Sequence, residues 1–368
     1  VSFGNCSKYL GPRRSTYFTP ICIIYLFIFA VGAVGNTLTC IVIIKHKIMR
    51  TPTNYYLLSL AISDLLVLLL GMPLELYELW SNYPFVFGQS GCSFKTLLFE
   101  TVCFASILNV TALSVERYIA VVHPLRAKYV VTRNHAKRVI FSVWVISILC
   151  SIPNTSLNGI LHLRVLGIGI VPGSATCTVV RPRWIYNLII QITTIFFFFL
   201  PMGTISVLYL LIGLQLNLRD QIREGGRRLP KRSAAAGEDP KETGIQKRVN
   251  EPTIHIFQVV KATVSNTELL CDAESQFNVL QALLDYECPA KCCYHAVILV
   301  VVFGICWAPF HTERLMWSFI NDWTEVMHQI FSFVHVISGV LFYLSSVVNP
   351  ILYNLLSTRF REMFKEVM

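Results

Sequence analysis

Seven long apolar stretches restrict the fold of this chain more than any other feature. An α-helix needs roughly 20 apolar residues to cross the hydrocarbon core of a bilayer. An isolated strand could not satisfy its backbone hydrogen bonds in lipid, whereas a helix does so internally. The stretches lie near residues 20–44, 55–79, 93–122, 139–160, 184–213, 296–320 and 328–355. The sequence therefore predicts an all-α membrane protein built as a seven-transmembrane helix bundle.

The composition supports a membrane protein and argues against a nucleic-acid partner. Of all residues, 54% are hydrophobic and 14% are charged, whereas soluble domains contain about a quarter charged residues. The net charge of +10 would suit nucleic acid if the basic residues formed one face. They lie instead in short segments between the apolar stretches, so we expect contact with membrane lipid and no nucleic acid.

The basic residues also predict the orientation of the bundle. Cytoplasmic segments of membrane proteins are enriched in Lys and Arg, so the first, third and fifth connections and the C-terminal segment are expected in the cytoplasm. The basic residues of the first and third connections are Lys45, Lys47, Arg50, Arg126, Lys128, Arg133, Lys137 and Arg138. The N-terminus is then extracellular, where Asn5 in Asn5-Cys6-Ser7 is a candidate glycosylation site. The chain starts at Val1 rather than at Met, so we expect residues to precede it.

Together, hydropathy and charge divide the chain into five segments. They are an extracellular N-terminus (1–19), transmembrane helices one to five (20–218), a long third cytoplasmic loop (219–293), helices six and seven (294–356) and a short cytoplasmic helix 8 (357–368). In the last segment Phe360 and Phe364 lie four residues apart, which places them on one face of a short amphipathic helix.

Among the polar residues inside the spans, three are candidates for a functional cluster. Asp64 lies in the second span, Asn36 in the first and Asn349 in the seventh. Polar groups inside a bilayer are costly, so they indicate function by default. A carboxylate with amide neighbours can hold a sodium ion or a proton, or it can simply join helices by hydrogen bonds.

Among the charged residues in the half of the bundle expected outside, three are candidates for a ligand site. Glu75 lies in the second span, Glu100 in the third and Arg314 in the sixth. Because charges facing lipid would be very unfavourable, we expect them to share a polar interior. A rise of 1.5 Å per residue places Glu100 roughly 12 Å below Cys92 along the helix, a depth that suits the floor of a ligand cavity.

The third span ends in Glu116-Arg117-Tyr118. Arg117 can extend to the membrane interface, or it can form with Glu116 an ion pair that breaks on activation.

Prolines interrupt the last three spans, at Pro201, Pro309 and Pro350. Each removes a helical hydrogen bond and kinks its helix, which suits helices whose ends must swing.

These motifs, one set per span and in order, resemble the rhodopsin-like (class A) G-protein-coupled receptors. The residues that carry the resemblance are Asn36, Asp64, Glu116-Arg117-Tyr118, Trp144, Pro201, Cys306-Trp307-Ala308-Pro309 and Asn349-Pro350-Ile351-Leu352-Tyr353. The resemblance implies a disulfide between Cys92 and Cys177. It also implies that Phe303 and Trp307 relay the effect of ligand binding through the bundle. The residues that receive it would be Arg117, Asn349 and Tyr353. The partner inside the cell would be a heterotrimeric G protein.

Within that family the chain is most similar to the neuromedin-U receptors, and to type 1 more than type 2. Runs such as Phe99-Glu100-Thr101-Val102-Cys103 and Phe303-Gly304-Ile305-Cys306-Trp307-Ala308-Pro309-Phe310-His311 carry this likeness. It implies a multi-pass receptor of the plasma membrane for an amidated neuropeptide, neuromedin U or S. Signalling would run through a Gq-type G protein, phospholipase C and calcium.

The resemblance implies a peptide with two arginines near its amidated end. Glu75 and Glu100 would offer carboxylates to them, because charge-assisted bidentate bonds are strong in a partly desolvated cavity. Alternatively, Glu100 pairs with Arg314 inside the receptor and gives the peptide nothing directly. Side chains expected to line the apolar remainder of the cavity are Phe99, Phe310, His311 and Tyr343.

The segment 219–293 departs from the family pattern. It replaces the basic inner end of the sixth span by Pro289-Ala290-Lys291-Cys292-Cys293-Tyr294, in the region that must move to admit a G protein. An alternative is therefore an isoform or gene-model product that binds peptide but does not signal. The nearby cysteines lack the loop spacing of a zinc site, and we expect no metal site.

Other classes of protein fit less well. A transporter would show inverted repeats and helices broken in both halves, and the sequence shows neither. A retinal protein needs a lysine in the seventh span, where this chain has none. No nucleophile–base constellation predicts an enzyme. A class A receptor for a different peptide remains a second alternative. No cofactor is expected beyond an allosteric sodium ion at Asp64.

Overall fold

The computed structural model describes residues 18–81, 84–165, 169–171, 173–227, 290–320, 322, 324–356 and 358–367. The predicted glycosylation site at Asn5 lies outside these residues, as does most of the predicted loop 219–293. By its contacts the chain divides into two compact units. Residues 1–215 and 292–368 form the first and contain the bundle, and residues 216–291 form the second. Of the second unit, the described residues are the last turns of one helix and the first residues of another.

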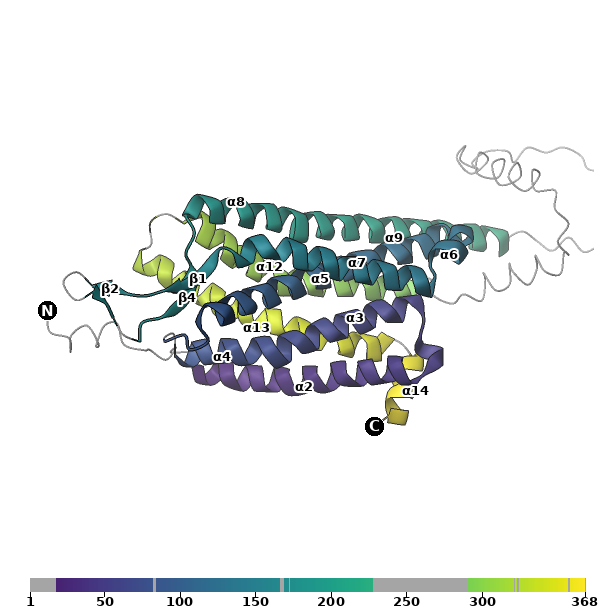
Figure 1. The fold of residues 1–368 in the computed structure, drawn as a ribbon. Helices are drawn as coiled ribbons and strands as arrows, with labels where there is room; N and C mark the ends of the chain where they lie inside the picture. Colours follow the sequence, from purple (N-terminus) through teal and green to yellow (C-terminus); the bar gives the residue numbers. More distant parts are fainter. Residues whose placement is uncertain are drawn as a thin grey trace, which may run out of the picture. The chain divides into compact units, whose positions relative to one another are not determined.

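The long helical stretches lie side by side in the first unit (Figure 1), apart from the last turns of α9 and the first two residues of α12, which belong to the second. These stretches are α2 (Phe18–Lys45), α3–η2–α4 (Pro52–Leu66, Val67–Gly71, Met72–Trp80), α5 (Gly88–Val122), α7 (Arg133–Thr155), α8–η3–α9 (Arg183–Thr194, Ile195–Phe199, Leu200–Arg227), α12 (Ala290–Phe319) and α13 (Glu325–Leu356). Six of the seven are long and apolar enough to cross a membrane by length and composition. The seventh, α12, has 30 residues and carries Glu313 and Arg314 near its end. The predicted seven-helix bundle is confirmed.

Helix α5 lies at the centre of the bundle. It packs against both α3 and α7, while α2 packs against α3 and α13. Of the residues in the most apolar part of α5, 67% are buried in the structure, whereas the share for α7 is 22%. The main core cluster joins α2, α3, α5, α12 and α13 through residues that include Tyr25, Leu68, Phe104, Trp307 and Tyr343. Helix α5 is therefore the element that can present side chains to several neighbours at once.

Short elements connect the spans. They are η1 (Lys47–Met49), α6 (Pro124–Val130), α14 (Thr358–Val367), β1 (Asn158–Leu161), β2 (Arg164–Val165), β3 (Gly169–Ile170) and β4 (Thr176–Val179). Strands β1 and β4 pair antiparallel, with Ile160 opposite Cys177, and β2 pairs with β3. The sequence did not predict this hairpin. We call the end of the bundle that carries it the disulfide end.

Helix α14 is the predicted helix 8. Phe360 and Phe364 are buried, with their ring centroids 5.6 Å apart. They pack into a second core cluster that contains Val42 of α2 and Tyr56 of α3. This cluster anchors α14 to the opposite end of the bundle from β1 and β4 (Figure 1).

In the described residues, two spans contain a π-helical segment that ends two residues before a proline. In η2 the N–H of Met72 bonds to the carbonyl of Val67, one residue ahead of Pro73. In η3 the N–H of Leu200 bonds to the carbonyl of Ile195, one residue ahead of Pro201. A proline cannot donate a backbone bond, and its ring clashes with the carbonyl four residues earlier. The wider π turn relieves that clash, so both spans continue instead of breaking.

Candidate functional site

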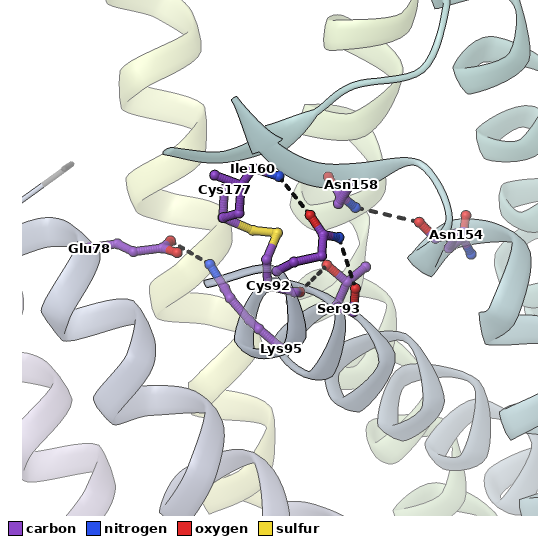
Figure 2. The surroundings of a disulfide bond; sticks show 10 residues. Glu78, Cys92, Ser93, Lys95, Asn154, Asn158, Ile160 and Cys177 are labelled. Atoms are coloured by element: carbon purple, nitrogen blue, oxygen red, sulfur yellow. Dashed lines mark hydrogen bonds and ion pairs between the residues drawn. A yellow bond between two sulfur atoms is a disulfide. The ribbon is translucent and has the colours of Figure 1, made fainter. Parts of the chain in front are cut away.

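A disulfide fixes the loop at the disulfide end to the bundle. Cys92 in the first turns of α5 is bonded to Cys177 in β4, so the predicted pairing is confirmed (Figure 2). The amide of Gln89 supports the same junction, because its Oε1 accepts a hydrogen bond from the backbone N–H of Ile160 in β1 (3.0 Å). The disulfide and this hydrogen bond thus both hold the hairpin on α5.

Glu100 is the centre of a buried polar cluster between three helices. Its carboxylate accepts two hydrogen bonds from Arg314 of α12, at 2.5 Å and 3.1 Å, and one from Asn154 of α7 at 3.0 Å. Glu100 is 5% exposed and the Arg314 side chain 16%. The arginine also lies over the ring of Phe310, 5.2 Å from its centroid. The structure therefore contains the intramolecular Glu100–Arg314 pair that the sequence left as an alternative.

Glu75 is held by neutral groups. The hydroxyl of Tyr25 donates to Oε1 of Glu75 (2.9 Å), and the hydroxyl of Tyr343 donates to Oε2 (2.8 Å). Tyr343 is fully buried and Tyr25 nearly so. In the described part of the chain no cationic side chain lies within ion-pair distance of Glu75. Its negative charge is therefore stabilised by hydrogen bonds but not neutralised.

The other two acidic residues of this region have cationic or titratable partners. Glu78 of α4 forms an ion pair with Lys95 of α5 close to the disulfide (Figure 2). Glu313 of α12 lies 2.7 Å from Nδ1 of His335 in α13. Of the acidic side chains discussed at this end of the bundle, Glu75 is the one that lacks such a partner.

Aromatic side chains connect this acidic region with the middle of the bundle. Phe99 lies beside Phe342, with ring centroids 5.8 Å apart, and Phe342 lies beside Trp307 at 5.4 Å. Trp307 in turn stacks on Phe303 at 5.0 Å. The predicted relay residues Phe303 and Trp307 thus lie in a continuous series of ring contacts. Whether the series transmits a signal stays a prediction.

Two more of the predicted cavity residues join this aromatic region. Phe310 stacks on Phe342 at 5.6 Å. His311 is buried and stacks on Phe198 at 4.5 Å. Its Nδ1 has no hydrogen-bond partner among the described residues. A buried polar atom without a partner is costly, so this nitrogen is suited to a ligand or a water.

Two of the mid-bundle polar residues, Asp64 and Asn349, line a small cavity. Asn349 donates to Oδ2 of Asp64 (3.0 Å). Both residues, with Ser106 and Phe303 among others, line a cavity of about 20 Å³. Asn36 bonds instead to the backbone carbonyls of Gly32 and Ser346, so it joins α2 to α13. The cavity holds about one water molecule or one small ion.

At the opposite end, Glu116 has a partner that the sequence did not indicate. The hydroxyl of Tyr56 in α3 donates to Oε1 of Glu116 (2.7 Å), while Oε2 is buried without a partner among the described residues. The suggested Glu116–Arg117 ion pair is absent from the ion pairs of the described residues. Consecutive helical residues point about 100° apart, which places Glu116 toward α3 rather than toward its neighbour. Tyr118 lies edge-on to His123, with centroids 5.9 Å apart.

Two of the predicted kinks lie inside continuous helices, at Pro309 in α12 and Pro350 in α13. The backbone of Tyr353 belongs to α13, but its side chain lies outside the described part of the structure. Their roles in activation therefore remain predictions.

The chain matches the family described as 7 transmembrane receptor (rhodopsin family) over residues 35–353. It belongs to the rhodopsin family. It is 52% identical to human neuromedin-U receptor 1, over 98% of this chain and 76% of the relative. It is 49% identical to human neuromedin-U receptor 2, over 97% and 73%. The pyrokinin-1 receptor of Drosophila melanogaster is 37% identical, over 100% and 84%.

These findings confirm the predicted likeness to the neuromedin-U receptors. The closer likeness to type 1 stays a prediction, because both mouse receptors are 48% identical to this chain. The chain is a multi-pass G-protein-coupled receptor of the plasma membrane and not an enzyme. Its partners are a peptide ligand and a heterotrimeric G protein.

The sequence did not predict the roles of several residues in these clusters. Tyr25, Tyr56 and Asn154 each donate to a carboxylate. The tyrosines lie in apolar spans, where an aromatic ring alone is unremarkable. The position of Asn154 could have predicted a polar contact, because a side-chain amide directly after Pro153 inside a span needs a polar partner.

The Tyr56–Glu116 bond yields a matched test. We expect Tyr56→Phe to lower the free energy of unfolding by about 0.6–2 kcal/mol, the range for hydrogen bonds between membrane helices, because Glu116 then has no donor. Tyr55→Phe is the control, since the ring of Tyr55 lies 5.2 Å from the Lys137 ammonium and phenylalanine keeps that contact. The measurement is thermal unfolding in detergent. Equal losses in the two variants would contradict the proposed importance of the bond.

Proposed function

We propose that this receptor binds an amidated peptide of the neuromedin-U and neuromedin-S type, with two arginines near its C-terminus. The observation that carries the proposal is Glu75, a partly buried carboxylate held by two tyrosine hydroxyls and by no cation among the described residues. The names of the similar receptors support the ligand class.

A peptide arginine is the chemistry that completes the Glu75 cluster. Each Glu75 oxygen accepts one tyrosine hydrogen bond and keeps lone-pair capacity for a second donor. A guanidinium offers paired donors and a charge that the site lacks, and such charge-assisted bonds are roughly twice as strong as neutral ones.

Glu100 offers a different environment to the second arginine. Arg314 already occupies both oxygens of its carboxylate. A peptide arginine reaches Glu100 only by competing with Arg314 or by sharing the carboxylate with it. We therefore propose Glu75 as the primary arginine site and Glu100 as the secondary one, with Phe99, Phe310, His311 and Tyr343 around the peptide.

The test compares carboxylate variants with peptide variants. We expect Glu75→Gln to weaken binding of the two-arginine peptide by about 1.5–3 kcal/mol, roughly 10- to 150-fold in Kd. The loss should nearly vanish for an analogue in which the arginine that meets Glu75 is replaced by neutral citrulline. Glu100→Gln should cause a smaller loss that depends on the other arginine. Radioligand competition on membranes measures all combinations.

Glu78→Gln is the control for this series. It changes the same residue type one turn along α4, but its carboxylate is occupied by Lys95. Its effect should be small for every peptide. Equal weakening of the arginine and citrulline peptides by Glu75→Gln would rule out direct contact.

For signalling we propose a Gq-type G protein, phospholipase C and calcium. Cells that express the unmodified chain should then release calcium in response to the peptide. The comparisons give no support to the alternative of a signalling-defective product. That alternative would be favoured if the chain bound peptide without a calcium response, and if replacing 219–293 by the loop of a similar receptor restored the response.

We also propose that the cavity beside Asp64 holds a sodium ion. Its volume of about 20 Å³ fits one small ion, and the Asp64 carboxylate, with the hydroxyl of Ser106 and the amide of Asn349 on the lining, supplies oxygen ligands. An ion that favours the inactive state weakens agonist binding by its differential affinity for the two states. Replacing sodium by choline should strengthen agonist binding to the native chain and leave Asp64→Asn unchanged. The same choline response in both chains would contradict the proposed ion site.

A further inference from the structure

A groove on the side of the bundle borders the Gln89–Ile160 junction and is lined by none of the residues of the acidic, aromatic and mid-bundle clusters described above. It lies between α5 and α7 at the disulfide end and has a volume of about 610 Å³, within the range of small-molecule sites. We call it the α5–α7 groove. Leu97 of α5, Ile152 of α7 and Val180 after β4 form apolar parts of its lining. Ser93, Ser156 and Arg181 contribute polar groups.

Arg181 is the charged residue of the groove. It is exposed, and its Nε donates to the carbonyl of Ser156 (3.2 Å). That bond fixes the side chain beside the groove while the two terminal nitrogens remain available. In the described residues Arg181 forms no ion pair. The groove therefore carries one positive charge, which matches the single negative charge of a phosphodiester.

The apolar side of the groove continues onto the exposed face of α7. Ile152 in the groove is 53% exposed, and Leu149, one turn along the helix, is 60% exposed. Only 22% of the residues in the most apolar part of α7 are buried inside the structure. In a membrane receptor such a face is covered by acyl chains. The groove is thus open to lipid along its α7 side.

An exposed tryptophan marks the level of the membrane surface here. Trp184 lies in the first turn of α8, three residues after Arg181, and is 69% exposed. Tryptophan is enriched where headgroups meet the hydrocarbon core. Arg181 is thus placed at headgroup depth, with Leu97 and Ile152 further along their helices toward the hydrocarbon.

We propose that the α5–α7 groove binds a phospholipid of the surrounding membrane. The phosphate contacts the guanidinium of Arg181, and one acyl chain lies between Leu97 and Ile152. A free phosphate ion in water would gain little, because a single exposed ion pair contributes only about 0–1 kcal/mol. A lipid adds the burial of its acyl chain and is already concentrated in the bilayer.

The experiment uses the full chain in nanodiscs that contain phosphatidylcholine with a photoactivatable diazirine in one acyl chain. After irradiation, mass spectrometry quantifies labelling of the peptide that contains Ile152. We expect Arg181→Gln to lower this labelling about threefold, the size of effect for one exposed charge contact. Ser156→Trp, which fills the groove but keeps the backbone carbonyl that holds Arg181, should remove most of it.

Arg164→Gln is the matched control, because Arg164 is an exposed arginine in β2 that does not line the groove. Its labelling should equal that of the native chain. Equal labelling in Arg181→Gln and Arg164→Gln, or no effect of Ser156→Trp, would overturn the proposal.

A second probe tests the phosphate without any substitution. Diacylglycerol with the same diazirine chain lacks the phosphate, so it should label the native chain about threefold less than phosphatidylcholine does. Its labelling should also be insensitive to Arg181→Gln. Equal labelling of the native chain by both probes would show acyl-chain burial alone and would refute recognition of the phosphate.

Discussion

Inside a bilayer a polypeptide must satisfy every backbone hydrogen bond within itself. This constraint makes the spans helical, and it also decides where polar side chains can lie. Glu100, Asp64 and Glu116 are all buried, and each accepts a hydrogen bond from a different helix. The bundle therefore has polar junctions at three levels, which join helices that are otherwise held by apolar packing. Removing one partner from such a junction leaves a buried acceptor with one hydrogen bond fewer, which is costly.

The acidic side chains at the disulfide end show how one chain can keep several carboxylates without using all of them for a ligand. Arg314, Lys95 and His335 partner Glu100, Glu78 and Glu313. Tyrosine hydroxyls hold Glu75 without changing its charge. The difference matters for recognition, because a cationic ligand group gains most where an anion is ordered but still charged. Composition alone would treat these four residues as equivalent.

Much of the architecture could be predicted from the sequence. The spans follow from hydropathy, and the pairing of Cys92 with Cys177 followed from the resemblance to a known family. The partners of individual polar groups could not be predicted so well. One of the two predictions for Arg117 paired it with Glu116, its neighbour in sequence, but Glu116 accepts a hydrogen bond from Tyr56, sixty positions away. Which side chain faces which depends on the rotation and packing of helices. Periodicity fixes those only to within a residue or so, and a hydrogen bond requires a few tenths of an ångström.

The π-helical segment Val67–Gly71 has a consequence for how this chain is compared with others. The wider turn accommodates one more residue than an α-helix would over the same length, so the residues after it are rotated relative to those before it by up to about 100°. Asp64 precedes the segment and Glu75 follows it. An alignment without a gap between these two positions, made against a chain that lacks the wide turn, would match each later residue to the wrong face of the helix. Glu75 would then be assigned to another face of the helix than the one that meets Tyr25 and Tyr343.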